Sequence, residues 1–263
     1  MMTKAKTNIL KFLSVLLLIP IMFAFTACFG NGQLDQKASC NTSGNYNQVA
    51  TRDDLNDIVG EQTTVNGSGY RMTMEYKGTY GNDFSAQTQI NAIIKNDEAA
   101  MRYATKYREN GQSGEEKADM YFKDGYVHME LNGRKIKFEA SLDAYFNNQE
   151  YGEYSSLFDA EQLMATIESN TDVTISRNGN NFKLVFNTLT IAGVDTANLR
   201  DIIAFLNFDN EGNLVAMRIS FNMTTTVYGA TANIEASVVI SAFDGEINFP
   251  NLSEYESTSL YDL

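Results

Sequence analysis

The sequence predicts an α+β protein in which an antiparallel β-sheet curls around a few short helices. From residue 70 onward, apolar and polar side chains alternate in one segment after another, which is typical of strands with one buried face. Asp124-Gly125 and Asn132-Gly133 join neighbouring segments, and both dipeptides favour two-residue hairpin turns. Segments with helical spacing stand between groups of strands and do not follow every strand, so a parallel sheet is not expected.

The first 27 residues have the order of parts found in a secretory signal peptide. Lys4, Lys6 and Lys11 make a basic start, residues 12–25 are almost wholly apolar, and two small residues precede Cys28. The end of this segment resembles the bacterial lipobox, whose cysteine receives acyl chains such as palmitate and becomes the first residue of the mature protein. We therefore expect a lipoprotein held by Cys28 on the extracytoplasmic face of the cell membrane.

Two alternatives stay open for this segment. A membrane-spanning helix needs about 20 apolar residues, whereas this run is shorter and contains Pro20. A signal peptide without lipidation is the other alternative, because a lipobox usually has Leu three residues before the cysteine and this chain has Phe25. In that case Cys28 and Cys40 could close a disulfide loop.

The charge of the chain argues against nucleic acid as a partner. Its formal net charge is −13, and loss of the signal peptide, which holds three lysines and no acid, lowers it to −16. Such a surface repels phosphate backbones and anionic head groups. Attachment to a membrane would therefore depend on the acyl chains and not on a basic patch.

The rest of the chain divides into three parts. Residues 28–49, rich in Gly, Asn, Gln and Ser, are expected to form the lipidated N-terminus and a flexible tether. A single domain follows over 50–252, and it begins with a short helix that Thr51 caps and Gly60 ends. Residues 253–263 form an acidic C-terminal tail.

The domain contains about ten predicted strands and two or three further helices. The strands are expected at 70–77, 84–95, 99–109, 117–123, 126–131, 134–140, 172–177, 181–189, 215–223 and 231–243. Helical spacing occurs at 141–147, at 159–169 and, after a possible cap at Asp195, through Ile203. These helices are expected to cover the apolar side of the sheet.

This order of elements resembles a known family. The stretches MYFKDGYVHM (120–129), NGRK (132–135) and FDNEGNL (208–214), the two long strands and Pro250 make residues 50–250 similar to lipoproteins of the bacterial LolA-like superfamily, with its LppX/LprG-type lipid-binding members. The resemblance implies an incomplete β-barrel, a strongly curved antiparallel sheet with short helices packed on its concave side. It also implies a cavity between sheet and helices, in which several relatives carry acylated lipids or lipoproteins.

Alternate apolar residues would line such a cavity, and many of them are Met, whose flexible side chain fits acyl chains of variable shape. The expected lining residues are Met72, Met74, Met129, Leu131, Phe138, Leu163, Ile167, Met217, Ile219, Phe221 and Met223. The expected function is binding or transfer of a hydrophobic ligand, a lipid or a lipoprotein. The alternative is an envelope protein with a solid core and no ligand, whose surface meets a protein partner or the cell wall.

Little in the sequence points to an enzyme, and no cofactor, catalytic residue or metal ligand is expected. The only histidine, His128, falls on the polar side of its strand, away from any partner for nucleophilic catalysis. Cys/His spacing for zinc and a glycine loop for phosphate are both absent from the sequence. The turn that starts at Asp209 could attract a cation, but acids are also ordinary turn formers.

Overall fold

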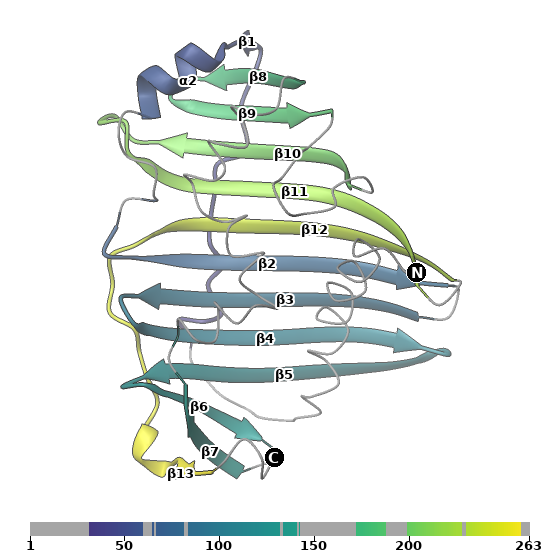
Figure 1. The fold of residues 1–263 in the computed structure, drawn as a ribbon, viewed down its shortest axis with the longest axis vertical. Coiled ribbons are helices and arrows are strands. Elements are labelled where there is room, and N and C mark those ends of the chain that lie inside the picture. The colour runs from purple at the N-terminus through teal and green to yellow at the C-terminus, as the bar shows by residue number, and fades with distance from the viewer. Residues whose placement is uncertain are drawn as a thin grey trace, which may run out of the picture.

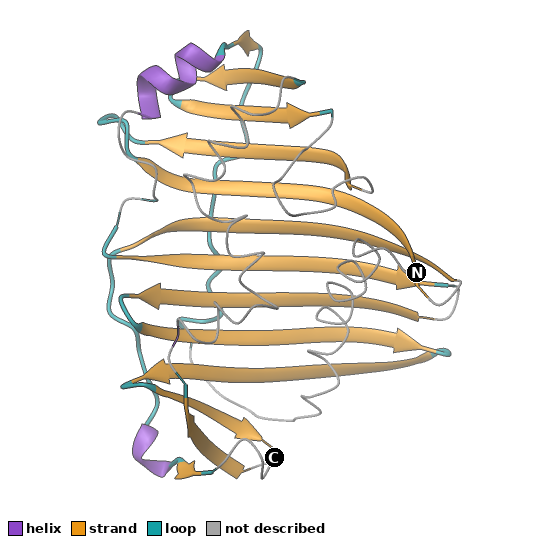
Figure 2. Ribbon diagram, viewed as in Figure 1, coloured by secondary structure: helices purple, strands orange, loops and turns teal. Residues whose placement is uncertain are grey.

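The computed structural model describes residues 32–59, 65, 67–81, 84–131, 134–140, 142, 172–187, 199–227 and 230–258. These residues form one open 13-stranded sheet with a short helix at one end (Figures 1 and 2). The predicted signal peptide, Cys28 and the helix over 159–169 lie outside the described residues, as does the helix over 141–147 apart from the buried Leu142.

The sheet contains the predicted strands, several of them longer than expected. The elements are β1 (Gln48–Val49), α2 (Arg52–Val59), β2 (Gly69–Tyr80), β3 (Phe84–Lys95), β4 (Glu98–Glu109), β5 (Gln112–Lys123), β6 (Tyr126–Leu131), β7 (Arg134–Glu139), β8 (Val173–Asn178), β9 (Asn181–Phe186), β10 (Leu199–Phe208), β11 (Leu214–Val227), β12 (Ala230–Phe243), the 3-10 helix η2 (Leu252–Glu254) and β13 (Glu256–Ser257). The prediction of an antiparallel sheet is confirmed, since only β13 pairs in parallel, with β7.

Two meanders lie side by side in this sheet. Its order is β1-β8-β9-β10-β11-β12-β2-β3-β4-β5-β6-β7-β13, so strands β8–β12 form one meander and β2–β7 the other. The seam between them is the antiparallel pair of β12 and β2, which runs from Ala232 opposite Tyr80 to Phe243 opposite Gly69 (Figure 1). Strands from opposite ends of the domain therefore meet at the middle of the sheet.

The alternation of side chains gives the sheet an apolar face and a polar face. The apolar face is the side to which Met72, Ala92, Met101 and Met120 point, and these four residues occupy one row across β2–β5. It carries one large cluster of buried side chains, with Phe122 and Val127 toward one end and Phe182 and Leu184 toward the other. The polar face is the opposite side, where Arg71, Asn91 and Arg102 follow the same strands.

The expectation of a flexible tether over 28–49 is wrong for its described part, residues 32–49, which together with Ala50 we call the strap. Leu34 of the strap is fully buried against Ile93 and Ala100 on the polar face. Arg71 Nη1 donates to the carbonyl of Gln33 at 2.7 Å, and Asn91 Nδ2 donates to the carbonyl of Leu34 at 2.8 Å. The strap continues across the sheet and ends as β1, which pairs with β8. Polar side chains of the sheet thus bind backbone carbonyls of the strap. The polar composition of the strap gives no sign of these contacts.

The acidic C-terminal tail is also partly packed on the polar face. In the segment 244–258, Ile247 and Tyr255 are buried, and Glu256 and Ser257 form β13. The ring of Tyr255 meets His128 edge-on, with centroids 5.4 Å apart. Apolar residues spaced along an acidic segment therefore close this end of the polar face.

The helix predicted from Asp195 through Ile203 is wrong over its described part. Leu199–Phe208 is instead strand β10, hydrogen bonded between β9 and β11. Ile202, Ala204 and Leu206 are buried at strand spacing on the apolar face. Pairing with two neighbouring strands outweighed the local helical spacing.

The short helix predicted after Thr51 is confirmed as α2. Thr51 Oγ1 accepts a hydrogen bond from the Asp54 amide at 3.1 Å, and the Asp54 carboxylate accepts one from the Thr51 amide at 2.7 Å. The reciprocal cap starts a helix that lies beside β8 and β9 (Figure 1), and its Leu55 belongs to the apolar cluster. Within the described ranges, no helix is long and apolar enough to cross a membrane.

Candidate functional site

The apolar face brings most of the expected lining residues together. Met72, Met129 and Met217 are buried in its main cluster, and Met74, Phe138, Ile219 and Phe221 pack against that cluster half-buried. Met223 belongs to a smaller cluster with Ala232 and Ile234. Leu131 is the last residue of β6, two residues after Met129, whereas Leu163 and Ile167 lie outside the described residues.

Partly accessible apolar side chains also cross the centre of this face, on either side of the buried Val238. Ile219, Met74 and Ile90 are half-buried, and they stand in one row because Ile219 pairs with Val238, Val238 with Met74, and Met74 with Ile90. Phe221 is half-buried two residues further along β11. We call Met74, Ile90, Ile219 and Phe221 the central strip, and it spans the seam between the two meanders.

A cluster of polar groups borders the central strip on the same face. Thr88 and Thr105 are buried, with their hydroxyls 2.7 Å apart, and Thr105 also donates to the hydroxyl of Tyr103. Glu116 pairs in register with Thr105, and its Oε2 is buried without a hydrogen-bond partner. Burial raises the pKa of Glu116. We call Thr88, Tyr103, Thr105 and Glu116 the polar cluster.

The polar cluster was missed at the level of sequence, although a signal for it exists. Thr88, Thr105 and Glu116 interrupt the apolar alternation of β3, β4 and β5. Only the pairing of the three strands places these interruptions in one row. An oxygen that is buried without a partner is costly, so it requires an explanation.

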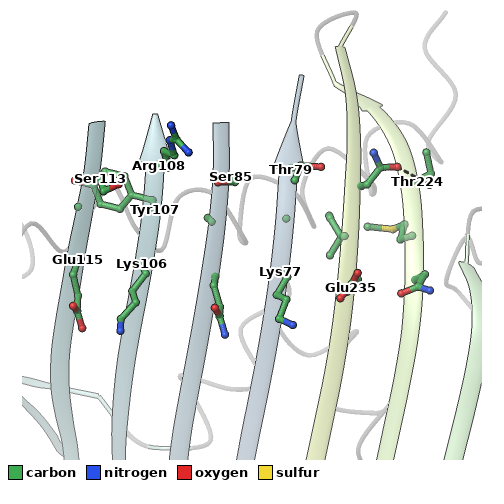
Figure 3. Close-up of a pocket in the computed structure, with 18 residues that line it drawn as sticks. Lys77, Thr79, Ser85, Lys106, Tyr107, Arg108, Ser113, Glu115, Thr224 and Glu235 are labelled. Atoms are coloured by element: carbon green, nitrogen blue, oxygen red, sulfur yellow. Dashed lines mark hydrogen bonds between the residues drawn. The ribbon is translucent and has the colours of Figure 1, made fainter. Parts of the chain in front are cut away.

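The polar face carries an open groove of about 900 Å³, over the ends of β11, β12, β2, β3, β4 and β5. Two rows of side chains border it (Figure 3). One row contains Glu235, Lys77, Lys106 and Glu115, and the other contains Thr79, Ser85, Arg108 and Ser113. We call this feature the polar groove.

His128, Cys40 and Asp209, which stood out in the sequence, are each held by contacts within the fold. His128 is buried under Tyr255, and burial lowers the pKa of its imidazole. Cys40 is a free thiol whose Sγ donates to Asn207 Oδ1 at 3.2 Å, and burial raises its pKa to about 12. Asp209 Oδ1 accepts hydrogen bonds from the amides of Glu211 and Asn213, so this carboxylate stabilises its own turn. Among the described residues, no group of three or more His, Cys, Asp or Glu side chains could hold a metal ion.

Comparisons with known proteins gave matches among solved structures alone. No protein-family model and no curated protein sequence matches the chain. Among solved structures, the chain is similar to LprF from Mycobacterium bovis, with a TM-score of 0.34 and 13% identity over 78% of this chain and 99% of that one. It is also similar to a LolA superfamily protein from Nitrosomonas europaea, with a TM-score of 0.28 and 9% identity over 81% of this chain and 99% of that one.

Proposed function

We propose that the protein is a lipoprotein of the outer side of the cell membrane that binds or transfers a hydrophobic ligand, a lipid by class. The observation that carries this proposal is the central strip, a row of half-buried apolar side chains in the middle of a wide apolar face. Ordinary cores bury such residues most completely at their centre. Here the most enclosed aromatic side chains, Phe122 and Phe182, lie toward the two ends.

The central strip has the chemistry to hold an acyl chain. Each buried methylene group contributes about 0.8 kcal/mol, so a chain that lies along four apolar side chains is stabilised without directional bonds. The flexible side chain of Met74 adapts to chains of different shape. The polar cluster at the border of the strip would meet the polar end of the same molecule, so an amphiphile fits better than a hydrocarbon.

Lipid extraction tests this proposal directly. The protein is purified in its native host, extracted with organic solvent, and the extract is analysed by mass spectrometry. A covalent anchor stays on the protein during extraction, so a lipid recovered reproducibly is a bound ligand. Extracts that contain no lipid beyond those of an unrelated lipoprotein purified in parallel would contradict the proposal.

A pair of variants places the ligand on the apolar face. Ile90→Trp fills the central strip, and Gln89→Trp puts the same side chain one residue earlier, on the polar face. We expect Ile90→Trp to lower the affinity for a fluorescent fatty acid at least about tenfold. A loss of about 1.4 kcal/mol in binding free energy suffices for that factor. Gln89→Trp should leave the affinity unchanged, and equal effects of the two variants would remove the strip from the proposal.

The anchor is tested separately by Cys28→Ala. If Cys28 carries the acyl chains, this variant moves from the membrane fraction to the soluble fraction, and the mass of the mature protein loses the acyl groups. Membrane retention that does not change would remove the anchor, while the lipid-binding test would stand unaffected.

A solid core without ligand is the second candidate function, and one observation favours it. Met72, Met129, Met217 and Met223 are each less than one-tenth exposed, as core residues are. Under this alternative the protein meets a partner in the cell envelope through its surface. Lipid-free extracts together with fatty-acid binding that Ile90→Trp does not change would support it.

A further inference from the structure

The polar groove is the part of the polar face that the strap and the C-terminal segment leave open. The strap is bound along the rows of Arg71, Thr73 and Arg102. The groove begins further along the same strands, at Lys77 on β2 and Lys106 on β4, and no residue of the strap or of 244–258 lines it. Its side chains are therefore available to a ligand.

None of the charged side chains of the groove is paired with a described residue, whereas several other charges of this face are. Outside the groove, Lys95 pairs with Glu246 at 2.6 Å and Lys123 with Glu98 at 2.9 Å. Inside it, none of the charged groups forms an ion pair or a side-chain hydrogen bond with any described residue. These groups are Lys77, Lys106, Arg108, Glu115 and Glu235, all of them exposed.

The strand register orders these groups into a symmetric row. Glu235, Lys77, Gln87, Lys106 and Glu115 follow one another across β12, β2, β3, β4 and β5. Neighbouring strands are about 4.8 Å apart, so the two lysines stand about 10 Å apart and the whole row spans about 19 Å. Cations thus surround β3, with Arg108 in the second row, and a carboxylate closes each end (Figure 3).

From this arrangement we propose that the polar groove binds a linear oligosaccharide that carries carboxylate groups. One carboxylate lies above β3, where Lys77, Lys106 and Arg108 surround it. Hydroxyl groups on either side bond to the amides and hydroxyls of the lining, among them Thr79 on β2 and Ser113 on β5. At the two ends of the row, Glu235 and Glu115 accept hydrogen bonds from further hydroxyls.

Charge complementarity selects this ligand over other anions. The groove holds three cations and two carboxylates, a small positive excess on a chain of net charge −13. A nucleic acid carries a phosphate at every nucleotide, and the two flanking carboxylates would repel it. An acidic oligosaccharide carries fewer charges and many hydroxyl groups, which match the neutral lining residues. Those residues are Thr79, Ser85, Gln87, Ser113, Asn222, Thr224 and Asn233.

Isothermal titration calorimetry on the purified full chain tests the proposal with three probes. They are an oligogalacturonate, a neutral maltooligosaccharide of the same length and a single-stranded oligothymidylate. The variant Lys77→Gln/Lys106→Gln removes two charges from the groove. The matched control Lys137→Gln/Lys183→Gln removes two charges from the same face outside it.

We expect the oligogalacturonate to bind and the two other probes to bind at least about tenfold more weakly, the factor that corresponds to one lost charge-assisted hydrogen bond. The groove variant should lose at least about tenfold in affinity for the oligogalacturonate, and the control should stay within about twofold. Absence of oligogalacturonate binding, equal binding of either other probe, or equal affinities of the two variants would overturn the proposal. Lys77 and Lys106 are exposed, and Lys137 and Lys183 are partly exposed. Thermal melts of the variants should therefore coincide with that of the wild-type protein, so that unfolding does not confound the comparison.

Discussion

At the scale of single residues, a buried ion pair ties the strap to the sheet. Arg102 donates from Nε to Asp119 Oδ1 and from Nη2 to Asp119 Oδ2, both at 2.6 Å, and its Nη1 reaches Asp35 of the strap. The side chains of Arg102 and Asp119 are 4% and 2% exposed. The bidentate geometry offsets the cost of desolvating both charges. Removal of either partner would leave the other charge buried without compensation.

We therefore expect Asp119→Ala to lower the free energy of unfolding by about 3–5 kcal/mol, because it leaves a buried guanidinium without its main partner. Urea denaturation measures this value. Glu75→Ala is the control, since it breaks the exposed pair with Lys37 and should cost at most about 1 kcal/mol. Similar losses in the two variants would contradict the importance of the buried pair.

A second prediction at this scale concerns the pH dependence that His128 contributes. Burial lowers the pKa of His128 below its ordinary value of about 6.5, so at mildly acidic pH the unfolded chain binds a proton that the folded one resists. His128 therefore costs no stability well above about pH 6.5, where it is neutral in both states. It destabilises the fold progressively as the pH falls below that value. Lys137 lowers this pKa further, whereas Asp124 opposes the shift.

The variant His128→Phe isolates this contribution, because a ring of similar shape can still meet Tyr255. Between pH 7 and pH 5, the wild-type protein should lose more stability in urea denaturation than the variant. The carboxylates are the same in both proteins, so they cancel in this comparison. Parallel pH profiles would show that His128 titrates alike in the folded and unfolded states.

At the scale of elements, the strap shows how a polar segment becomes part of a fold. Its most deeply buried residue is Leu34, and several of its other contacts use backbone groups, such as the amide of Ala38, which donates to Thr73 Oγ1 at 2.8 Å. Asn207 fixes the far part of the strap, since its amide group accepts from the amide of Asn41 and donates to the carbonyl of Asn41. The strap thus crosses both meanders and bridges their seam.

Limited proteolysis tests this role. We expect trypsin to cut slowly after Lys37 in the wild-type protein and rapidly in Leu34→Asp, because a charge at a fully buried position costs at least about 3 kcal/mol and releases the strap. Ser39→Asp, at an exposed position of the strap, should remain resistant. Rapid cleavage of the wild-type protein would instead indicate a tether.

At the scale of the whole molecule, the sheet stays open, and each edge ends in a strand of two residues, β1 or β13. Very short edge strands offer little backbone for pairing with another chain. The segment that ends in β13 also covers Tyr121 and His128, which are 1% and 5% exposed. Closure of the polar face and protection of one edge therefore depend on the same C-terminal segment.

A chain that ends at Asp244 should consequently expose apolar surface. Loss of Ile247, Phe249 and Tyr255 removes about 1.5–3 kcal/mol for each buried side chain, and dye binding to exposed apolar surface should rise. Glu256→Ala, at an exposed position of the same segment, serves as the control. Unchanged stability and dye binding in the shortened chain would show that the segment is dispensable.

The sequence by itself determined most strands of this protein and the face to which each side chain points. The strands at 84–95 and 126–131 have the predicted bounds, since alternation and the turn dipeptides are local signals. The same signals placed on one face those expected lining residues whose side chains the structure describes. They also predicted the Thr51 cap correctly, because a cap depends on residues three apart.

Features that depend on contacts between residues far apart in the sequence were decided only by the tertiary structure. The pairing of β12 with β2 joins the meanders and brings Ile219 beside Met74 in the central strip. Leu199–Phe208 became a strand because two neighbours were available for pairing, and the strap became ordered because Arg71 and Asn91 bind its backbone carbonyls. Backbone hydrogen bonding and register carry no signature in local composition, so neither the polar cluster nor the polar groove could be found before the strands were paired.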